Sequence, residues 1–271
     1  MYLEYYGLKE PPFDITPNPR FLYFSAKHRE AFNHLLYGIR ERKGFVQLTG
    51  EVGCGKTTIC RALLEQLGPT YSTALILNPV LSADQLMKAI GMEFGLEVKG
   101  MDRLESVAVM NQFLLEQAEK GKDVVLIIDE AQDLTDELLE QVRLLSNLET
   151  DDCKLLQIVL MGQPELRHRL GHQRLRQLRQ RITVRYHLTP LSRLEMTQYI
   201  QHRLQVSGSR GAPYFTQWAL WRIHRYSNGI PRLINALCDK SLLAGYVRQA
   251  DRIDFRTVGL AIRELEGKFS A

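Results

Sequence analysis

The sequence predicts an α/β protein whose parallel sheet is covered by helices on both faces and is followed by an all-helical domain. Five strand-like segments alternate with helical patterns up to about residue 189, and no strand pattern follows them. Strands that alternate with helices are joined by crossovers and therefore run parallel. The changes of pattern predict three domains: an N-terminal arm over 1–24, an α/β core over 25–189 and a helical domain over 190–271.

The N-terminal arm is rich in proline and aromatic residues and is expected to be irregular. Apolar side chains at helical spacing predict the first helix over about 26–40. The strands are expected at 45–49, 73–78, 124–128, 155–161 and 182–188. Further helices are expected from Lys56 onward and over about 82–95, 102–120 and 134–149.

Helix-start signals predict four helices after residue 190. Ser192 and Glu195 have the spacing of a capping box, in which each side chain bonds to the other residue's backbone amide. Thr216 and Asp254 are favourable N-cap residues, and Pro231 suits the first turn of a helix.

The composition is that of an ordinary globular protein, with 45% hydrophobic and 24% charged residues among 271. The apolar strand over 124–128 is far shorter than the roughly 20 residues that span a bilayer, and the N-terminus does not resemble a signal peptide. The cysteines show neither paired nor metal-ligand spacing, so we expect no zinc and no disulfide; they are Cys54, Cys60, Cys153 and Cys238. These features favour a cytoplasmic location.

Charge is divided unevenly along the chain. Residues 1–159 contain 16 Lys and Arg against 24 Asp and Glu, a net charge of −8, whereas residues 160–271 contain 19 against 7, a net charge of +12. Three interpretations stay open: a basic face for nucleic acid, complementary faces that stack between copies, and solvated faces without function.

A phosphate-binding loop is expected between the first strand and the helix that follows it. The P-loop pattern GxxxxGK[ST] is matched by Gly50, Glu51, Val52, Gly53, Cys54, Gly55, Lys56 and Thr57, and Thr58 completes the expected site. Glycines let backbone N–H groups point into the loop, and the helix N-terminus favours a bound anion. We expect Lys56 to contact the β- and γ-phosphates of ATP and the Thr57 hydroxyl to bind Mg²⁺. Cys54 should point away from the phosphates, either as a tolerated small residue or as a redox-sensing thiol.

Two acidic residues follow the apolar third strand. Asp129 can hold Mg²⁺ through water, and Glu130 is placed to act as a general base toward the attacking water. The competing interpretation is that both acids merely begin the next helix, where carboxylates are favoured. Asn78 ends the expected second strand, so its side chain either restrains Glu130 or simply starts the turn at Pro79.

Together these motifs resemble those of AAA+ ATPases, and more closely those of the secretion ATPases of the ExeA/GspA family and their pilus-biogenesis relative MshM. The resemblance covers nearly the whole chain and depends on the P-loop and on the segments 5–8, 12–13, 16–23, 129–132, 162–166 and 229–232. It implies a P-loop NTPase with a three-layer core of strand order 5-1-4-3-2, a helical lid, and ATP bound between them. It also implies ATP hydrolysis by a homo-oligomer, for which a hexameric ring is one form.

The resemblance also assigns roles to single residues. Gln163, after the fourth strand, would sense the γ-phosphate, unless it is a plain loop residue. Arg232, at the start of a lid helix, would contact phosphate from the same chain, unless it is only solvated. Arg181, with Arg179 as the alternative, would be the finger that reaches a neighbouring subunit's γ-phosphate.

The N-terminal arm contributes a further expectation from the same resemblance. Pro17 and Phe21 would form part of the adenine pocket, unless the arm only packs on the core. Members of this family usually continue into a transmembrane helix and a periplasmic peptidoglycan-binding domain, which this chain lacks. We therefore expect either an excised ATPase domain or a naturally short form.

The leading functional hypothesis is an oligomeric AAA+ ATPase that drives assembly of a secretion or MSHA-like type IV pilus system, with partners at the bacterial inner membrane. The second is a DNA-binding ATPase similar to the transposition helpers, in which the seven arginines over 167–185 contact phosphates. The third is a nucleotide-gated scaffold that binds ATP but barely hydrolyses it, against which Asp129, Glu130 and Gln163 argue. A helicase interpretation is weak because the chain is too short for a second motor domain.

Overall fold

The computed structural model describes residues 1–14, 18–147 and 154–268. The chain forms two compact units, which we call the helical unit and the sheet unit. The helical unit comprises Met1–Lys27, Glu51–Thr58 and Thr189–Ala271, and the sheet unit comprises His28–Gly50 and Ile59–Leu188. The chain therefore passes from one unit to the other four times, and the P-loop segment belongs to the helical unit.

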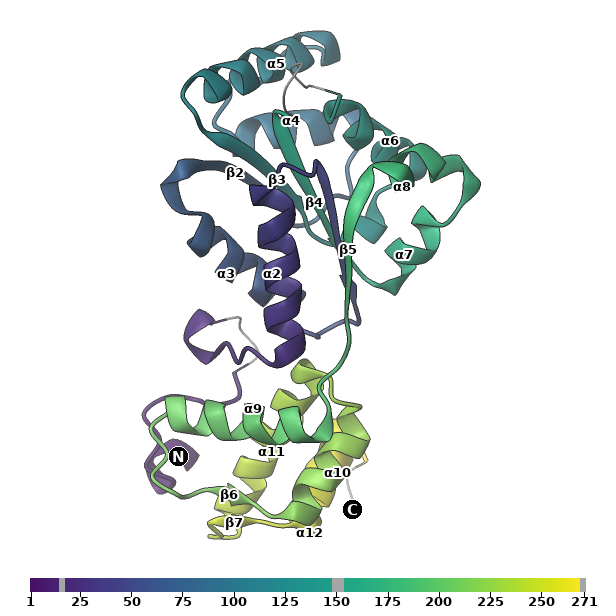
Figure 1. Ribbon diagram of the computed structural model, residues 1–271. Coiled ribbons are helices and arrows are strands. Elements are labelled where there is room, and N and C mark those ends of the chain that lie inside the picture. Colours follow the sequence, from purple (N-terminus) through teal and green to yellow (C-terminus); the bar gives the residue numbers. More distant parts are fainter. Residues whose placement is uncertain (15–17, 148–153, 269–271) are drawn as a thin grey trace. The chain divides into compact units, whose positions relative to one another are not determined.

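A parallel five-stranded sheet forms the centre of the sheet unit (Figure 1). Its strands are β1 (Phe45–Gly50), β2 (Tyr71–Ile76), β3 (Asp123–Ile128), β4 (Leu156–Gly162) and β5 (Ile182–Leu188). They lie in the order β2-β3-β4-β1-β5, which confirms the expected order 5-1-4-3-2. The second strand begins and ends two residues earlier than the sequence predicts. Its last residue, Ile76, lies opposite Ile128 at the end of β3, so the ladder ends before Asn78.

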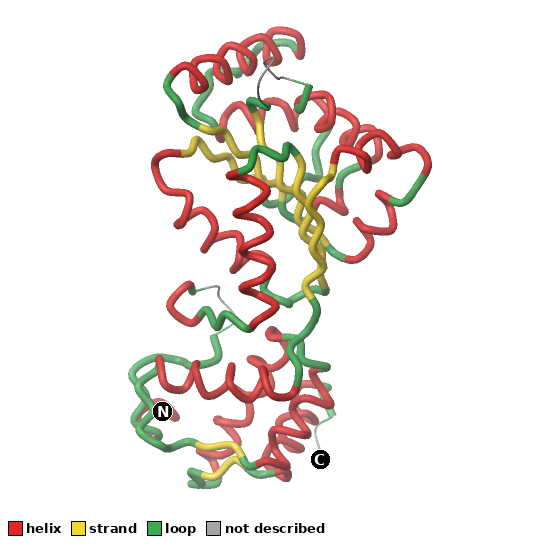
Figure 2. The backbone as a smooth tube through the Cα atoms, in the orientation of Figure 1, coloured by secondary structure: helices red, strands yellow, loops and turns green. Residues whose placement is uncertain are grey.

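Seven helices and three short 3₁₀ turns accompany the sheet in the described residues (Figure 2). The helices are α2 (Ala26–Arg40), α3 (Lys56–Leu67), α4 (Ala83–Glu93), α5 (Arg103–Glu119), α6 (Asp136–Leu145), α7 (Pro164–Leu170) and α8 (Arg176–Arg181). The 3₁₀ turns are Gly68–Thr70, Ala131–Asp133 and Gln173–Leu175.

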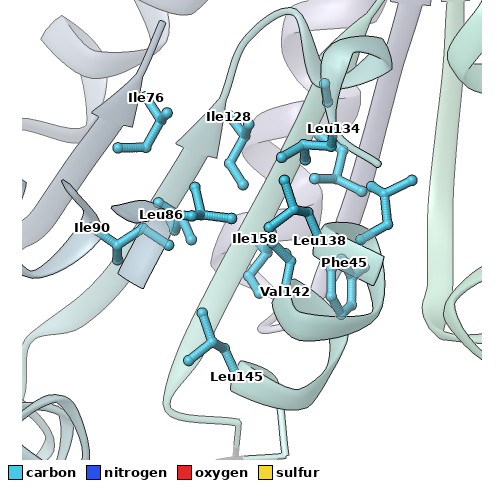
Figure 3. Packing of buried hydrophobic residues seen from close by; sticks show 14 of the residues in the cluster. Phe45, Ile76, Leu86, Ile90, Ile128, Leu134, Leu138, Val142, Leu145 and Ile158 are labelled. Atoms are coloured by element: carbon cyan, nitrogen blue, oxygen red, sulfur yellow. The ribbon is translucent and has the colours of Figure 1, made fainter. Parts of the chain in front are cut away.

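Apolar side chains cover both faces of the sheet. On one face, strand residues such as Ile128 and Ile158 pack with Leu86 of α4 and Leu138 of α6 (Figure 3). On the other face, Gly38 of α2 lies so close to β1 that a Cβ atom there would overlap a valine side chain. Central parallel strands are buried on both faces, which explains the wholly apolar sequence of β3 after its first residue.

Four helices form most of the helical unit: α9 (Arg193–Val206), α10 (Gln217–Ser227), α11 (Pro231–Val247) and α12 (Phe255–Leu265). Ser192 and Glu195 form the expected capping box, and Thr216 and Asp254 each accept a hydrogen bond from a backbone amide of the helix they cap. The structure differs from the expectation in one respect, because two short strands, β6 (Tyr214–Phe215) and β7 (Arg252–Ile253), pair in parallel. A two-residue strand has no periodic pattern, so the sequence does not predict it.

The N-terminal arm packs within the helical unit. It contains a short helix, α1 (Tyr2–Tyr5), and a 3₁₀ turn at Pro19–Phe21, although the sequence predicts an irregular chain. Tyr6, Leu8 and Phe13 are buried in one apolar cluster with side chains of α9 to α12. The arm therefore supplies part of the core of this unit.

Arg203 of α9 attaches the arm to this core. Its side chain is 6% exposed, and its guanidinium donates hydrogen bonds to the carbonyl oxygens of Pro12 and Asp14 and to the Tyr199 hydroxyl. Burial removes a carbonyl oxygen from water, and the free energy that this costs is not compensated once the carbonyl loses its hydrogen-bond donor. Arg203 is therefore expected to contribute strongly to stability.

Replacing Arg203 by alanine should lower the free energy of unfolding by about 2–4 kcal/mol, because the arm carbonyls lose their donors. Urea unfolding followed by tryptophan fluorescence measures this, since Trp218 and Trp221 lie in the same unit. Arg210→Ala is the matched control, because Arg210 is exposed and should change stability by less than about 0.5 kcal/mol. Equal effects of the two variants would contradict the assignment.

Candidate nucleotide-binding site

The P-loop begins at the carboxyl end of β1. Gly50 is the last residue of this strand, and a Cβ atom there would lie 2.6 Å from the carbonyl oxygen of Leu188 in β5. Gly53 and Gly55 have φ angles of +79° and +97°, a region that side chains disfavour. These glycines permit the turn that leads into α3 at Lys56.

Within the helical unit, the P-loop contacts the start of α11. The amide of Arg232 donates to the carbonyl oxygen of Gly53 at 3.2 Å. A Cβ atom on Gly53 would lie 2.6 Å from the Cβ atom of Arg232. The Arg232 side chain is exposed. The arginine expected in the lid is therefore next to the loop, bonded to it through the backbone, with its guanidinium accessible.

The side chains of the P-loop differ in exposure. Lys56 is only 5% exposed, and its ammonium donates to the carbonyl oxygen of Glu51 at 3.2 Å. Thr57 and Thr58 are half-buried, whereas the side chains of Glu51 and Val52 are exposed. The loop thus keeps its cationic group within the fold and directs Glu51 and Val52 to solvent.

The cysteines of the described residues, Cys54, Cys60 and Cys238, are buried free thiols, and Cys153 lies outside the described residues. Burial raises the pKa of the Cys54 thiol to about 11. The reactive form of cysteine is the thiolate, which is scarce at neutral pH when the pKa is so high. The environment of Cys54 therefore favours the interpretation of this residue as a tolerated small residue over its interpretation as a redox-sensing thiol.

Asp129 and Glu130 follow β3 at the carboxyl edge of the sheet. Asp129 is 2% exposed, and its amide donates to the carbonyl oxygen of Ile76 at 2.8 Å. Burial and, to a smaller extent, the Asp129 carboxylate raise the pKa of the Cys60 thiol to about 12. Cys60 lies in α3, so the Asp129 carboxylate is near enough to this helix to affect the Cys60 thiol.

Two glutamine amides hold the Glu130 carboxylate. Nε2 of Gln132 donates to Oε2 of Glu130 at 2.8 Å, and Nε2 of Gln163 donates to the same oxygen at 3.2 Å. The backbone of Glu130 has a φ of +51°, which is uncommon for a side-chain-bearing residue, and its amide donates to Oδ1 of Asp129 at 2.9 Å. These bonds orient the carboxylate through Oε2, so that Oε1 can accept a hydrogen bond from water.

Gln132 is a site residue to which the sequence assigned no role. Its Oε1 accepts from the backbone amide of Gln163 at 3.0 Å, which fixes the side-chain nitrogen toward Glu130. A Cβ atom on Gly162 would lie 2.9 Å from this Oε1, so the glycine at the end of β4 makes room for the amide. Arg169 of α7 donates to the carbonyl oxygen of Gln132 at 3.0 Å. The signal available in the sequence was a glutamine two residues after the glutamate, and its partner Gln163, directly after β4, becomes a neighbour only in the fold.

Asn78 is exposed and lies two residues beyond the end of β2. Within the described residues, the hydrogen bonds to the Glu130 carboxylate come from Gln132 and Gln163. A restraining role of Asn78 stays a prediction, and the two glutamines now offer an alternative to it.

The two candidate finger arginines have different surroundings. Arg181 is half-buried and donates to Oγ of Ser146 at 2.6 Å and to the carbonyl oxygen of Arg143 at 3.4 Å, at the end of α6. Arg179 is exposed and donates to the carbonyl oxygen of Gly171 at 3.2 Å. Arg179 therefore presents more of its guanidinium to another molecule than Arg181 does.

The expected adenine pocket is described only in part. Phe21 is 5% exposed, and the guanidinium carbon of Arg203 lies 4.9 Å from the centre of its ring. Pro17 lies outside the described residues. The adenine pocket therefore stays a prediction.

The donor set of the P-loop fits a phosphate with a magnesium ion. It combines a helix N-terminus with the buried ammonium of Lys56 and the hydroxyl of Thr57. In the described parts of the chain, no three His, Cys, Asp or Glu side chains gather as a metal site. A magnesium ion at the P-loop would therefore need phosphate oxygens and water in addition to Thr57.

The fold and these motifs define a P-loop protein of the AAA class. An AAA domain family matches residues 39–170, which include the P-loop, Asp129 and Glu130. General secretion pathway protein A of Aeromonas hydrophila is 49% identical over 268 residues, which are 98% of this chain and 49% of that protein. The chain belongs to the AAA ATPases of this ExeA/GspA type. It spans about half the length of this relative.

Solved structures show the same fold at low identity. The ORC2 protein of Aeropyrum pernix has a TM-score of 0.69 and 15% identity, with 97% of this chain and 73% of that chain covered. Cdc6p of Pyrobaculum aerophilum has a TM-score of 0.73 and 16% identity, with 93% and 70% covered. Proteins of this class are generally ATPases that bind nucleotide with Mg²⁺. Of the helices that the structure describes, none has the length and apolar character to cross a bilayer.

Proposed function

We propose that this chain binds Mg-ATP at the P-loop and hydrolyses it, with Glu130 as the general base. The observation that supports this most is the Glu130 carboxylate held on one oxygen by Gln132 and Gln163. An oriented carboxylate within hydrogen-bond reach of a water can take its proton as the water attacks the γ-phosphate. The competing interpretation, that the acids only begin a helix, does not account for two amides converging on this side chain.

The other residues have complementary roles in this proposal. Lys56 neutralises the β- and γ-phosphate oxygens, while Thr57 and Asp129 hold the magnesium ion, which would neutralise charge on the transferring phosphoryl group. Gln163 donates one hydrogen of its Nε2 to Glu130, and the second hydrogen of this amide remains for the γ-phosphate or the attacking water. Gln163 would then connect the presence of the γ-phosphate to the position of the base.

Arg232 would couple the bound nucleotide to the position of α11 in the helical unit. Its backbone bond to Gly53 keeps the start of α11 at the loop, and its exposed guanidinium is available for a phosphate of the same chain. A guanidinium that binds only when phosphate is present favours one position of α11 over others.

We further propose that the active form is a homo-oligomer in which an arginine of one copy completes the site of its neighbour. The exposure of Arg179 supports this residue as the finger over Arg181, which bonds to the end of α6. The name of the Aeromonas relative supports a role in secretion. The proposed role is assembly of a secretion or type IV pilus system, with partner proteins at the inner membrane.

Turnover of Mg-ATP by the purified chain tests the proposed activity. Lys56→Ala should lower ATP affinity by at least about tenfold and remove turnover, because the phosphates lose a buried cation. Lys99→Ala is the matched control, since Lys99 is exposed and outside the loop, and it should behave like the parent chain. Turnover that survives in Lys56→Ala would contradict hydrolysis at this site.

Mixing two inactive variants tests the shared site. Glu130→Gln lacks the base and Arg179→Ala lacks the proposed finger, so each should be inactive alone. If the finger acts on a neighbouring copy, an equimolar mixture regains about a quarter of the parent turnover, because about a quarter of random interfaces join an intact base to an intact arginine. No recovery in a mixture that forms oligomers would contradict the shared site, whereas the activity of the parent chain would still stand.

A further inference from the structure

A second polar pocket, of about 380 Å³, lies in the sheet unit beside the edge strand β5. It is bounded by β1 and β5 and by the helices α7 and α8, which lie beside β5 in Figure 1. Its polar lining residues are Gln47, Thr49, Arg167, Arg179, Arg185 and His187. No lining residue belongs to the P-loop or to the Asp129–Glu130 motif, so this pocket is a separate feature of the fold.

The charge of this pocket is strongly positive. Three of its lining residues are arginines and none is acidic, and these arginines take part in no ion pair with the described residues. Arg185 donates to the carbonyl oxygen of Arg179, and Arg179 in turn donates to that of Gly171. These bonds use a small part of the five N–H donors of each guanidinium, so donors remain for a ligand.

The floor of the pocket is polar where a buried strand would ordinarily be apolar. Gln47 and Thr49 are 5% and 2% exposed and project from β1 on the side of α7 and α8. They lie opposite Arg185 and His187 in the register of β5, and Thr49 Oγ1 is 3.0 Å from Nδ1 of His187. The register thus places two buried polar side chains directly beside two basic ones.

Gln47 adds an amide to the floor of the pocket. The residue is only 5% exposed, and it lines the pocket. An amide has both donor and acceptor atoms, so a polar ligand bound in the pocket can form a hydrogen bond with Gln47.

We propose that this pocket binds a phosphate group of a small ligand. Three guanidiniums without a carboxylate among them suit a dianion, and their planar donors match phosphate oxygens in pairs. The volume exceeds that of one phosphate and leaves room for a further polar group at Gln47. The ligand is a small phosphorylated solute that is free in solution, and the experiment separates it from the nucleotide of a neighbouring copy.

Binding of inorganic pyrophosphate to the Lys56→Ala variant of the whole 271-residue chain tests the proposal, because this variant lacks a working P-loop. Calorimetry at fixed ionic strength should show binding that the added pair of substitutions Arg167→Ala and Arg185→Ala weakens by at least about tenfold. Gln47→Leu should weaken it as well. Arg176→Ala is the matched control, because Arg176 is an exposed arginine of α8 outside the pocket, and it should leave binding unchanged.

Association of copies, measured by mass photometry, separates this pocket from the shared site proposed above. Loss of ATP-dependent association in the Arg167→Ala, Arg185→Ala variant, without binding of pyrophosphate to Lys56→Ala, would assign these arginines to the shared site and overturn the pocket. Absence of pyrophosphate binding, or equal weakening by Arg176→Ala, also overturns it. Neither measurement depends on hydrolysis, so failure of the pocket and failure of the proposed activity are distinguishable.

Discussion

The Glu130→Gln variant is expected to bind Mg-ATP as well as the parent chain and to hydrolyse it about 10²–10⁴ times more slowly. Glutamine has the shape of glutamate and can still accept through its side-chain oxygen from Gln132 and Gln163, so the local geometry should persist. What is lost is the ability to take a proton from water. Steady-state turnover and equilibrium ATP binding, measured on the same preparation, separate these two effects.

Glu165→Gln provides the matched control for this prediction. Glu165 is exposed in the first turn of α7, two residues after Gln163, so the substitution makes the same chemical change next to the site without altering the base. Its turnover should stay within about twofold of the parent value. If Glu130→Gln retained full turnover, another group would have to be the base, and if it lost ATP binding, Glu130 would have a structural role instead.

The Gly53→Ala variant is expected to lose at least about tenfold in affinity for Mg-ATP. The residue has a φ of +79°, and its new Cβ atom would lie 2.6 Å from the Cβ atom of Arg232. Backbone atoms would have to move to relieve this overlap, and the N–H groups that bind phosphate would move with them. Titration with a fluorescent ATP analogue measures the change.

The Gly68→Ala variant separates the effect of the atomic overlap at Gly53 from the free-energy cost of a positive φ. Gly68 has a φ of +63°, but a Cβ atom there would meet nothing within 4 Å. Both variants should therefore lose about 1 kcal/mol of stability from the unfavourable φ, and only Gly53→Ala should lose ATP binding. Unchanged affinity in Gly53→Ala would show that the contact with Arg232 is unimportant for the nucleotide.

Two strands could be predicted well from the sequence. The bounds of β3 were predicted within one residue, because an apolar run between helical patterns leaves few alternatives. The bounds of the edge strand β5 were predicted without error, because its apolar and polar residues alternate at its start. The predicted end of β2 was wrong because its last pairing residue depends on where the neighbouring strand β3 ends. β6 and β7 were not predicted for the same reason. Each has only two residues, and these are strands only because the two segments pair with each other.

The site could be predicted where a motif carries its own geometry. The P-loop glycines specify a local turn, so the sequence was sufficient to place them between β1 and α3. The role of Gln132 could not be predicted from the sequence. Its partners Glu130 and Gln163 follow two different strands, which are brought together only by the fold. Arg179 and Arg181 are two positions apart, and the sequence does not show which of them bonds to the end of α6.

The location of the N-terminal arm has a consequence for biosynthesis. The Tyr2 hydroxyl donates to Asp239, 237 positions along the chain, and the cluster that buries Phe13 includes residues of α12. A ribosome adds roughly 5–20 residues per second, so the first residues wait roughly 10 to 50 seconds for their partners. The sheet unit ends at Leu188 and can fold during that interval. The aromatic side chains of the nascent arm thus stay uncovered until α9 to α12 have been synthesised, and the helical unit closes after the sheet unit is complete.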